Sequence, residues 1–197
     1  MLYVLCGENE FDKRQKLAAL IAGGAVPERY DGEQLDAASL RDIMQGQSLF
    51  TLERTVIISR LSDNAALWAE LSEITVSSST EVILLENKLD KRTKTYKWLR
   101  KNAEIYEFTP LNERQKPQLA KWCVDEARKQ GYTLSAVQAE TLIDRLGYDQ
   151  LRLSNFIEQL SFTGEITDDL LDKLAPLAKT ESAFELFIKL HILSAIQ

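Results

Sequence analysis

Short apolar runs alternate with helical patterns over the first half of the chain. The runs at residues 2–6, 55–59, 82–85 and 105–108 are rich in β-branched, Leu and Tyr residues, which is typical of strands. They lack an alternating polar face, so they indicate strands buried on both sides, as in a parallel sheet covered by helices. Residues 29–31 are a further, shorter candidate strand.

Helical periodicity fills the intervals between these runs. The predicted helices follow Phe11 up to the glycines at 23 and 24, follow the N-cap Asp36, and cover residues 65–71 and 91–101. Strand and helix therefore alternate throughout this part. We predict an α/β fold in which helices cover a parallel sheet.

After Pro110 the strand pattern stops and only helices are predicted. Their start signals are Pro117 in a first turn, a capping box of Ser135 with Gln138, Asp149, and Thr167 before residues 168–174. An amphipathic pattern over residues 181–196 predicts one more helix. We therefore divide the chain into an α/β domain, a small helical domain and a terminal helix, at residues 1–110, 111–180 and 181–197.

Composition places the chain among ordinary globular proteins. Of its 197 residues, 45% are hydrophobic, and none of the apolar runs approaches the length that spans a bilayer. The stretch at residues 1–10 is too short and too acidic for a signal peptide. We therefore expect a cytoplasmic protein with no membrane partner. The net charge of −6 disfavours tight binding to nucleic acid by the chain alone. Cys6 and Cys123 are expected to be buried free thiols.

The sequence lacks the signature of a nucleotide-hydrolysing site. A phosphate cradle after the first strand needs several glycines and a Lys. Here Gly7 is followed by Glu8, Glu10 and Asp12, whose carboxylates would repel phosphate. At the end of the third apolar run, Glu86 is only a weak match to an acidic residue that holds magnesium.

Other catalytic chemistry is equally unsupported. The single histidine, His191, lies between apolar residues of the terminal helix, where a structural role is the commoner one. We therefore expect no catalytic residues, no cofactor and no metal site, and a protein that is not itself an enzyme. A diverged nucleotide-binding ATPase is the alternative.

The segment from Gln45 to Phe50 carries the strongest functional signal. Leu49 and Phe50 are adjacent large apolar residues in an expected surface connection between a helix and a strand. One interpretation is that both fold back onto their own core. The other is a hydrophobic plug for a partner's pocket, in which each side chain would contribute about 1.5–3 kcal/mol on burial. Gln45 would then hydrogen-bond at the pocket rim.

Several stretches together resemble the delta-subunit family of bacterial DNA polymerase III clamp loaders. Gln45, Ser48, Leu49 and Phe50 match its Q-x-x-[S/L]-L-F type of clamp-binding motif, which lies at the same point of the fold. The other similar stretches are residues 5–11, 86–92, 151–160, 164–167 and 184–186. The resemblance covers nearly the whole chain in the family's order and spacing.

The resemblance implies a fold and a mechanism. It implies an AAA+-like sheet domain without a working nucleotide site, followed by a helical lid. It implies a cytoplasmic subunit for DNA replication, part of a complex with DNA polymerase activity, that inserts its plug into the sliding clamp (the beta subunit) and helps hold or open the ring. The implied partners are the clamp, other loader subunits, and DNA within the assembled complex, with ATP hydrolysed by the neighbouring subunits.

The chain departs from the family in two respects. Gln47 stands where relatives can have an apolar residue, so a narrower plug is expected. Family members also continue into a helical collar domain that joins the loader pentamer, and residues 181–197 are expected to be the start of the linker to it, whether the sequence is truncated or naturally short.

A basic run follows the third apolar run. Apart from Lys88, its possible DNA or subunit contacts are Lys91, Arg92, Lys94, Lys97, Arg100 and Lys101, set against the single acidic residue Asp90. A solvated helix face is one interpretation. A contact with DNA phosphates or with an acidic subunit surface is the other, and it leaves a DNA-binding module as a further alternative function.

Overall fold

The chain forms two compact units in a computed structural model, Met1–Thr109 and Pro110–Gln197. The structure describes residues 1–22, 26–46, 54–162 and 167–174. Ser48, Leu49, Phe50, the glycines at 23 and 24, and the terminal helix with His191 lie outside the described residues. The predicted domain roles, including the lid and the linker to a collar, stay predictions.

A five-stranded sheet organises the first unit, and all its described pairings are parallel. The strands are β1 (Leu2–Gly7), β2 (Glu28–Asp31), β3 (Arg54–Ser59), β4 (Thr80–Glu86) and β5 (Glu104–Phe108). Their order across the sheet is β2-β3-β4-β1-β5. The parallel α/β fold class predicted from the sequence is therefore confirmed.

The prediction that the strands are apolar on both faces is wrong for the two edge strands, β2 and β5. In β2 Glu28 is exposed, and in β5 Glu104 and Glu107 are exposed. Each edge strand pairs with one neighbour only, so solvent reaches side chains that a second neighbouring strand would cover. The central strand β1, in contrast, is buried from Leu2 to Cys6.

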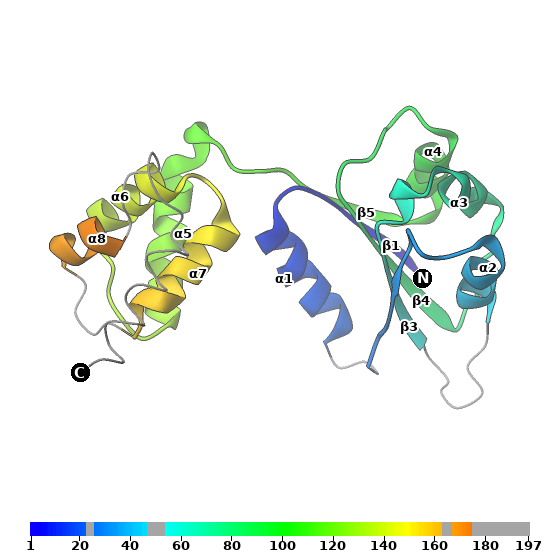
Figure 1. The fold of residues 1–197 in the computed structure, drawn as a ribbon, viewed down its shortest axis with the longest axis horizontal. Helices are drawn as coiled ribbons and strands as arrows, with labels where there is room; N and C mark the ends of the chain where they lie inside the picture. The colour runs from blue at the N-terminus through cyan, green and yellow to red at the C-terminus, as the bar shows by residue number, and fades with distance from the viewer. Residues whose placement is uncertain (23–25, 47–53, 163–166, 175–197) are drawn as a thin grey trace. The chain divides into compact units, whose positions relative to one another are not determined.

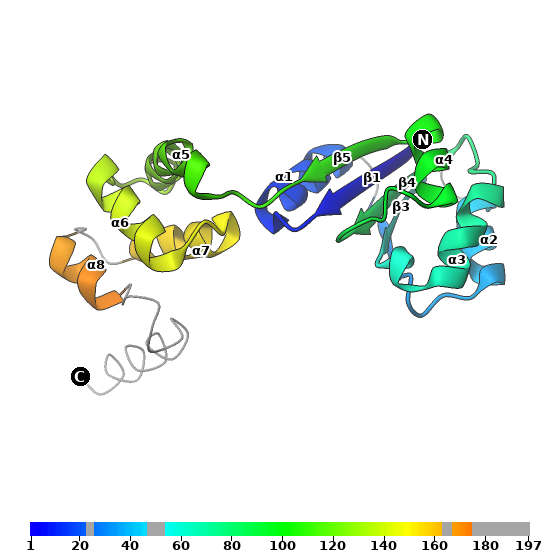
Figure 2. The same ribbon diagram turned by 90° about the horizontal axis from the view of Figure 1, so that it is seen from above.

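Helices cover the two faces of this sheet unequally. They are α1 (Glu10–Ile21), α2 (Ala37–Gln45), α3 (Ala65–Glu70) and α4 (Lys94–Asn102), with the short 3-10 turns η1 (Leu61–Asp63) and η2 (Leu71–Glu73). Helix α1 packs on one face, and α2, α3 and α4 pack on the other (Figure 1 and Figure 2). The face under α1 has only a small buried cluster, which comprises Tyr3, Leu5, Ile57 and Ile83.

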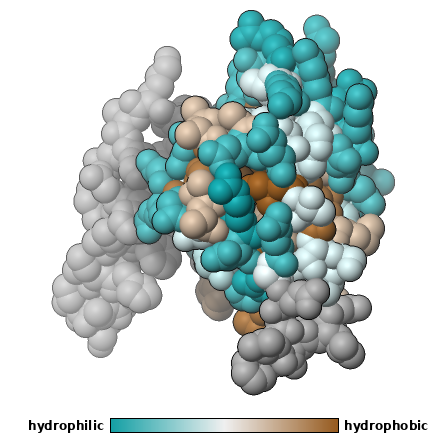
Figure 3. Space-filling model, turned by 90° about the vertical axis from the view of Figure 1, so that its right-hand side faces the viewer, coloured by the Kyte–Doolittle hydropathy of each residue, from teal (hydrophilic) through white to brown (hydrophobic). Residues whose placement is uncertain are grey.

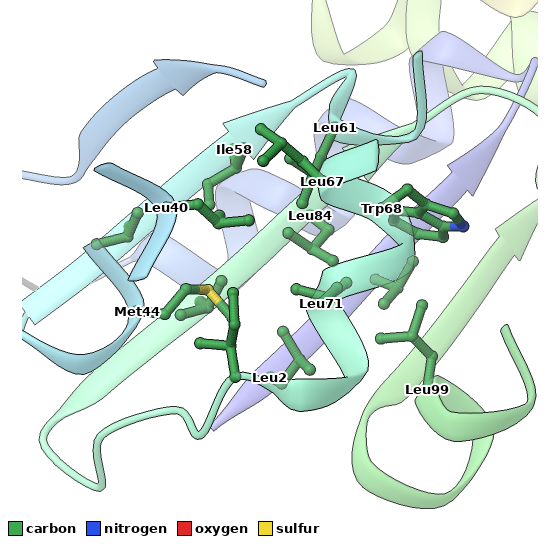
Figure 4. Packing of buried hydrophobic residues seen from close by; sticks show 14 of the residues in the cluster. Leu2, Leu40, Met44, Ile58, Leu61, Leu67, Trp68, Leu71, Leu84 and Leu99 are labelled. Carbon is green, nitrogen blue, oxygen red and sulfur yellow. The ribbon is translucent and has the colours of Figure 1, made fainter. Parts of the chain in front are cut away.

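The main core lies between the sheet and α2, α3 and α4. Figure 4 shows Leu40 and Met44 of α2 pointing toward the same interior as Leu71 and Leu84, all fully buried. Trp68 and Leu99 extend this cluster toward α4 (Figure 4). Each such aliphatic side chain contributes about 1.5–3 kcal/mol relative to an exposed one. This core fixes the end of α2, where the predicted plug segment begins.

Polar caps set the helix ends. The predicted cap at Asp36 is confirmed, because its carboxylate accepts a hydrogen bond from the Ser39 amide at 2.7 Å. The predicted start of a helix at Lys91 is wrong. Thr93 caps α4 through the Tyr96 amide, while the Arg92 amide donates to the Asp90 carboxylate and holds a turn there. Residues 91–93 therefore precede the helix.

The second unit is helical over its described residues. It contains η3 (Glu113–Gln115), α5 (Lys116–Lys129), α6 (Ala136–Leu146), α7 (Gln150–Leu160) and α8 (Asp168–Leu174). The predicted capping box of Ser135 with Gln138 is confirmed, as are the caps at Asp149 and Thr167. A separate apolar cluster that includes Leu142 holds these helices together.

Both cysteines are free and buried, as predicted. Burial raises the pKa of the Cys123 thiol to about 12 and also raises that of Cys6, so neither thiol ionises readily. Across the described parts of the chain, no helix has the length and apolar character needed to cross a bilayer.

Candidate functional site

The predicted clamp-binding segment begins where α2 ends. Gln45, the last residue of that helix, is exposed, and Gly46 follows it in extended conformation. The orientation of Leu49 and Phe50, which lie outside the described residues, stays a prediction. The structure instead defines the two flanks from which this segment departs and to which it returns.

Both flanks are held by the loop that leads into β4. The Ser77 amide donates to the Met44 carbonyl at 3.0 Å, and the Arg54 amide donates to the Ser79 carbonyl at 3.0 Å. Met44 is fully buried. The Arg54 guanidinium also donates to the Ile43 carbonyl at 3.2 Å, which links the start of β3 directly to α2. The two flanks are therefore both tethered at the amino-terminal edge of the sheet, by which we mean the side where its parallel strands begin. The carboxyl-terminal edge is the side where they end.

An ion pair fixes Arg54 from its other side. The Arg54 Nη2 atom donates to the Glu28 Oε2 atom at 2.6 Å, and Glu28 also accepts a hydrogen bond from the Tyr30 hydroxyl at 2.7 Å. The hydrogen bond from Arg54, followed by that from Tyr30, lowers the pKa of Glu28 to about 2. This role of Arg54 cannot be predicted from local sequence, because its partner Glu28 belongs to a distant edge strand.

Gly46 is required by a close approach at the first flank. Its amide donates to the Asp42 carbonyl at 2.7 Å. A Cβ atom at this position would lie 2.3 Å from that carbonyl oxygen, closer than side-chain carbons are found to backbone oxygen. Any other residue would have to move the backbone at the start of the segment.

The opposite edge of the sheet is where parallel α/β proteins usually bind ligands. The connection from β1 leads across the sheet to β2, whereas the connection from β4 leads the other way to β5, so a crevice is expected between the carboxyl ends of β1 and β4. Lys13 occupies this place. Its ammonium donates to the Gly7 carbonyl at 3.0 Å and to the Glu86 carbonyl at 3.3 Å, and it pairs with Glu10 at 2.6 Å.

The backbone amides at this edge are also engaged inside the chain. The Gly7 amide donates to the Asn87 carbonyl at 2.7 Å, and the Asn9 amide donates to the Phe108 carbonyl at 3.2 Å. The Asn9 side chain caps α1 by accepting from the Asp12 amide at 3.2 Å. A phosphate cradle works through free amides at this place. Here these amides hold the strand ends together instead.

The Glu86 carboxylate, a weak match to a magnesium-holding residue, has a structural role in the described chain. It accepts from the Leu61 amide at 3.0 Å and from the Ser62 amide and hydroxyl at 3.2 and 2.5 Å. Only 1% of Glu86 is exposed, and this burial raises the pKa of its carboxyl group. The sequence gives no signal for this role or for the burial of Lys13, because both depend on which strands become neighbours.

Some basic side chains of the predicted DNA or subunit contact form ion pairs within the chain, and others do not. Lys91 pairs with Glu107 at 2.7 Å, Arg92 with Asp90 at 2.9 Å and Lys94 with Glu73 at 3.6 Å. The expectation that Asp90 alone opposes this run is therefore wrong, since acidic partners come from β5 and η2. Within this run, the exposed cations that form no ion pair with another described residue are Lys97, Arg100 and Lys101 of α4, together with Lys88.

A hollow of about 420 Å³ opens at the amino-terminal edge of the sheet, beside α4. Its walls are the start of β1, the connection from η2 to β4, and the last turns of α4. Its lining includes Met1, Ile74, Ser77, Ser78, Trp98 and Asn102. Ser77 is thus both a wall residue and the partner of Met44, which joins the hollow to the first flank of the tethered segment.

No family model matches the chain, and no curated protein matches it. Among solved structures, it is similar to the DNA clamp loader delta protein YqeN of Bacillus subtilis, with a TM-score of 0.57 and 20% identity over 98% of this chain and 67% of that one. It is also similar to a RuvB mutant of Thermotoga maritima, with a TM-score of 0.53 and 12% identity over 98% of this chain and 62% of that one.

At these identities the likeness concerns the fold. It supports the predicted architecture of a parallel sheet covered by helices. The predicted clamp-binding residues and the basic contacts are not tested by it and are taken up below as proposals.

Proposed function

We propose that the chain is a clamp-loader subunit of the delta type, which binds a sliding clamp through Gln45, Ser48, Leu49 and Phe50 without hydrolysing ATP. The observation that carries the proposal is the position of this motif in an AAA+-like fold. Its flanks are bonded to the loop of residues 77–79, so Gly46 and Arg54, which bound the seven residues 47–53, lie at the same edge of the sheet.

Pinned flanks favour binding because they limit the entropy that the segment loses on docking. Met44 at one end is buried, and Arg54 at the other is bonded to both α2 and β2. A Leu and a Phe presented from such a base have the character of an interface hot spot. Gln45, exposed at the end of α2, would add a hydrogen bond at the rim.

The lack of ATP hydrolysis is supported by the carboxyl-terminal edge. The Lys13 ammonium already binds two carbonyls and the Glu10 carboxylate there, and the amides of Gly7 and Asn9 donate within the chain. Phosphate binding would have to break these contacts. The role proposed for this chain in replication is therefore mechanical, with ATP hydrolysed by other subunits and DNA approached within the assembled complex.

The test is the double substitution Leu49→Ala with Phe50→Ala. Loss of both apolar side chains should weaken binding to the clamp of the same organism by at least about 100-fold, because each contributes about 1.5–3 kcal/mol on burial. Binding is measured by surface plasmon resonance, and the melting temperature should change little.

Leu17→Ala with Leu20→Ala is the matched control. It likewise truncates two large apolar side chains, here half-buried ones of α1, which packs on the face of the sheet opposite to α2. Its folded fraction should bind the clamp like wild type. A Leu49/Phe50 variant that keeps wild-type affinity would show that the plug has been assigned wrongly.

A further inference from the structure

The surface beside the tethered segment has a shape and a charge of its own. On α4, Trp98 and Asn102 are one turn apart and line the hollow. Lys97 and Lys101 are likewise one turn apart, on the solvent side of this pair. The hollow therefore has a half-buried aromatic wall and a basic margin, although the chain as a whole carries a net charge of −6.

The cations at this margin are not neutralised by the described part of the chain. Lys94, one turn earlier, pairs with Glu73, which itself lines the hollow. Lys97 and Lys101 make no such pair in the described ranges, and both are exposed. Figure 3 shows the side of the first unit that carries α2, α3 and α4, where hydrophilic residues surround a smaller hydrophobic area. The uncompensated positive charge of Lys97 and Lys101 favours an acidic ligand.

The position of the hollow indicates which ligand meets it. Ser77 binds the Met44 carbonyl at 3.0 Å, and the Thr80 hydroxyl donates to the Gly46 carbonyl at 3.5 Å. The loop that forms one wall of the hollow is thus in direct contact with the first flank of the clamp-binding segment. A protein docked at Gln45 and Gly46 would therefore also lie against this loop.

We infer that the hollow and its basic margin form a second contact for the same ring-shaped partner, and that they receive an acidic segment of it. The inference rests on the proposed function, because the partner is the one bound through Leu49 and Phe50. A small-molecule site fits less well, since the charged wall residue Glu73 is exposed and already paired with Lys94. The second contact would fix the orientation of the partner and increase the rate of association.

Two independent variants test this contact in the full chain. Lys97→Glu with Lys101→Glu reverses the basic margin, and Ser78→Glu places a negative charge at the exposed loop on the other side of the hollow. Each should weaken clamp binding about threefold to tenfold, since exposed charge contacts are individually weak. The affinity lost should be largest at low salt and decrease as salt is added.

The matched control is Arg14→Glu with Lys121→Glu. Both side chains are exposed and lack an ion pair among the described residues, and they come from α1 and α5, neither of which lines the hollow. This variant has the same net charge as the α4 variant. It should keep wild-type affinity, so that a general effect of charge is separated from a local one.

The outcomes separate this inference from the proposed function. Wild-type affinity of both test variants, with binding abolished by Leu49→Ala and Phe50→Ala, would overturn the second contact and leave the plug in place. Full binding by the Leu49/Phe50 variant would overturn both. If the α4 variant binds the clamp normally but loses a salt-dependent affinity for duplex DNA, the basic margin is a DNA contact and the inference is wrong.

Discussion

The two edges of the sheet in the first unit use their polar groups differently. At the carboxyl-terminal edge, the Lys13 ammonium, the Gly7 amide and the Glu86 carboxylate all bind partners within the chain. At the amino-terminal edge, Gln45 is exposed at the end of α2, and a hollow opens beside α4, whose Lys97 and Lys101 are exposed. Parallel α/β proteins usually bind ligands at the first of these edges. Here that edge is part of the internal structure, and the features suited to a partner lie at the other.

This difference has an energetic side. Buried polar groups with complete hydrogen bonding stabilise a fold, and removing one partner leaves another group unsatisfied. Substitutions at the carboxyl-terminal edge are therefore expected to lower stability and to leave clamp affinity unchanged. The amino-terminal edge should behave in the opposite way. The following experiments are ordered by the size of the effect that they should produce.

The largest effect is expected from Glu86→Ala. The substitution removes the acceptor of three hydrogen bonds from Leu61 and Ser62, and the Leu61 amide is left buried without a partner. Stability should fall by about 2–4 kcal/mol. Urea unfolding measures the loss, and clamp binding by the folded fraction should not change. Asn87→Ala, at the exposed next position, is the control and should be nearly neutral. A neutral Glu86→Ala would mean that this edge is not held by the carboxylate.

A smaller effect on stability, but a larger one on binding, is expected from Gly46→Ala. The added Cβ would approach the Asp42 carbonyl to 2.3 Å, so the backbone must shift where the plug segment begins. The free energy of unfolding should fall by roughly 1 kcal/mol. The free energy of binding to the clamp should weaken by more than that amount. Ala38→Ser adds one heavy atom at an exposed position of the same helix and serves as the control. Unchanged affinity in Gly46→Ala would show that this flank does not orient the segment.

The smallest effect is expected from Mg-ATP. A ligand that binds the folded chain with a Kd one hundredth of its concentration would stabilise it by about 2.7 kcal/mol. Because the Lys13 ammonium and the Gly7 amide are already engaged, we expect no shift in melting temperature and no heat of binding by calorimetry. Saturable, magnesium-dependent binding would break the comparison between the edges and would favour the diverged ATPase.

Local pattern was sufficient for the elements of this protein. The apolar runs at β1, β3, β4 and β5, and the caps at Asp36 and Ser135, follow from neighbouring residues alone, because strand propensity and capping act over a few positions. Local pattern predicts the start of α4 three residues early, since a basic run with helical propensity gives no sign that Asp90 and Thr93 organise a turn.

The sequence by itself thus determined the parallel α/β class, the helical second half and the place of the Gln45–Phe50 motif between a helix and a strand. Only the tertiary structure decided what surrounds that motif and what fills the opposite edge. Lys13 and Glu86 are 73 positions apart, and Met44 and Ser77 meet only because α2 and the loop before β4 end at the same edge. Such contacts depend on the order of strands in the sheet, which no local pattern encodes.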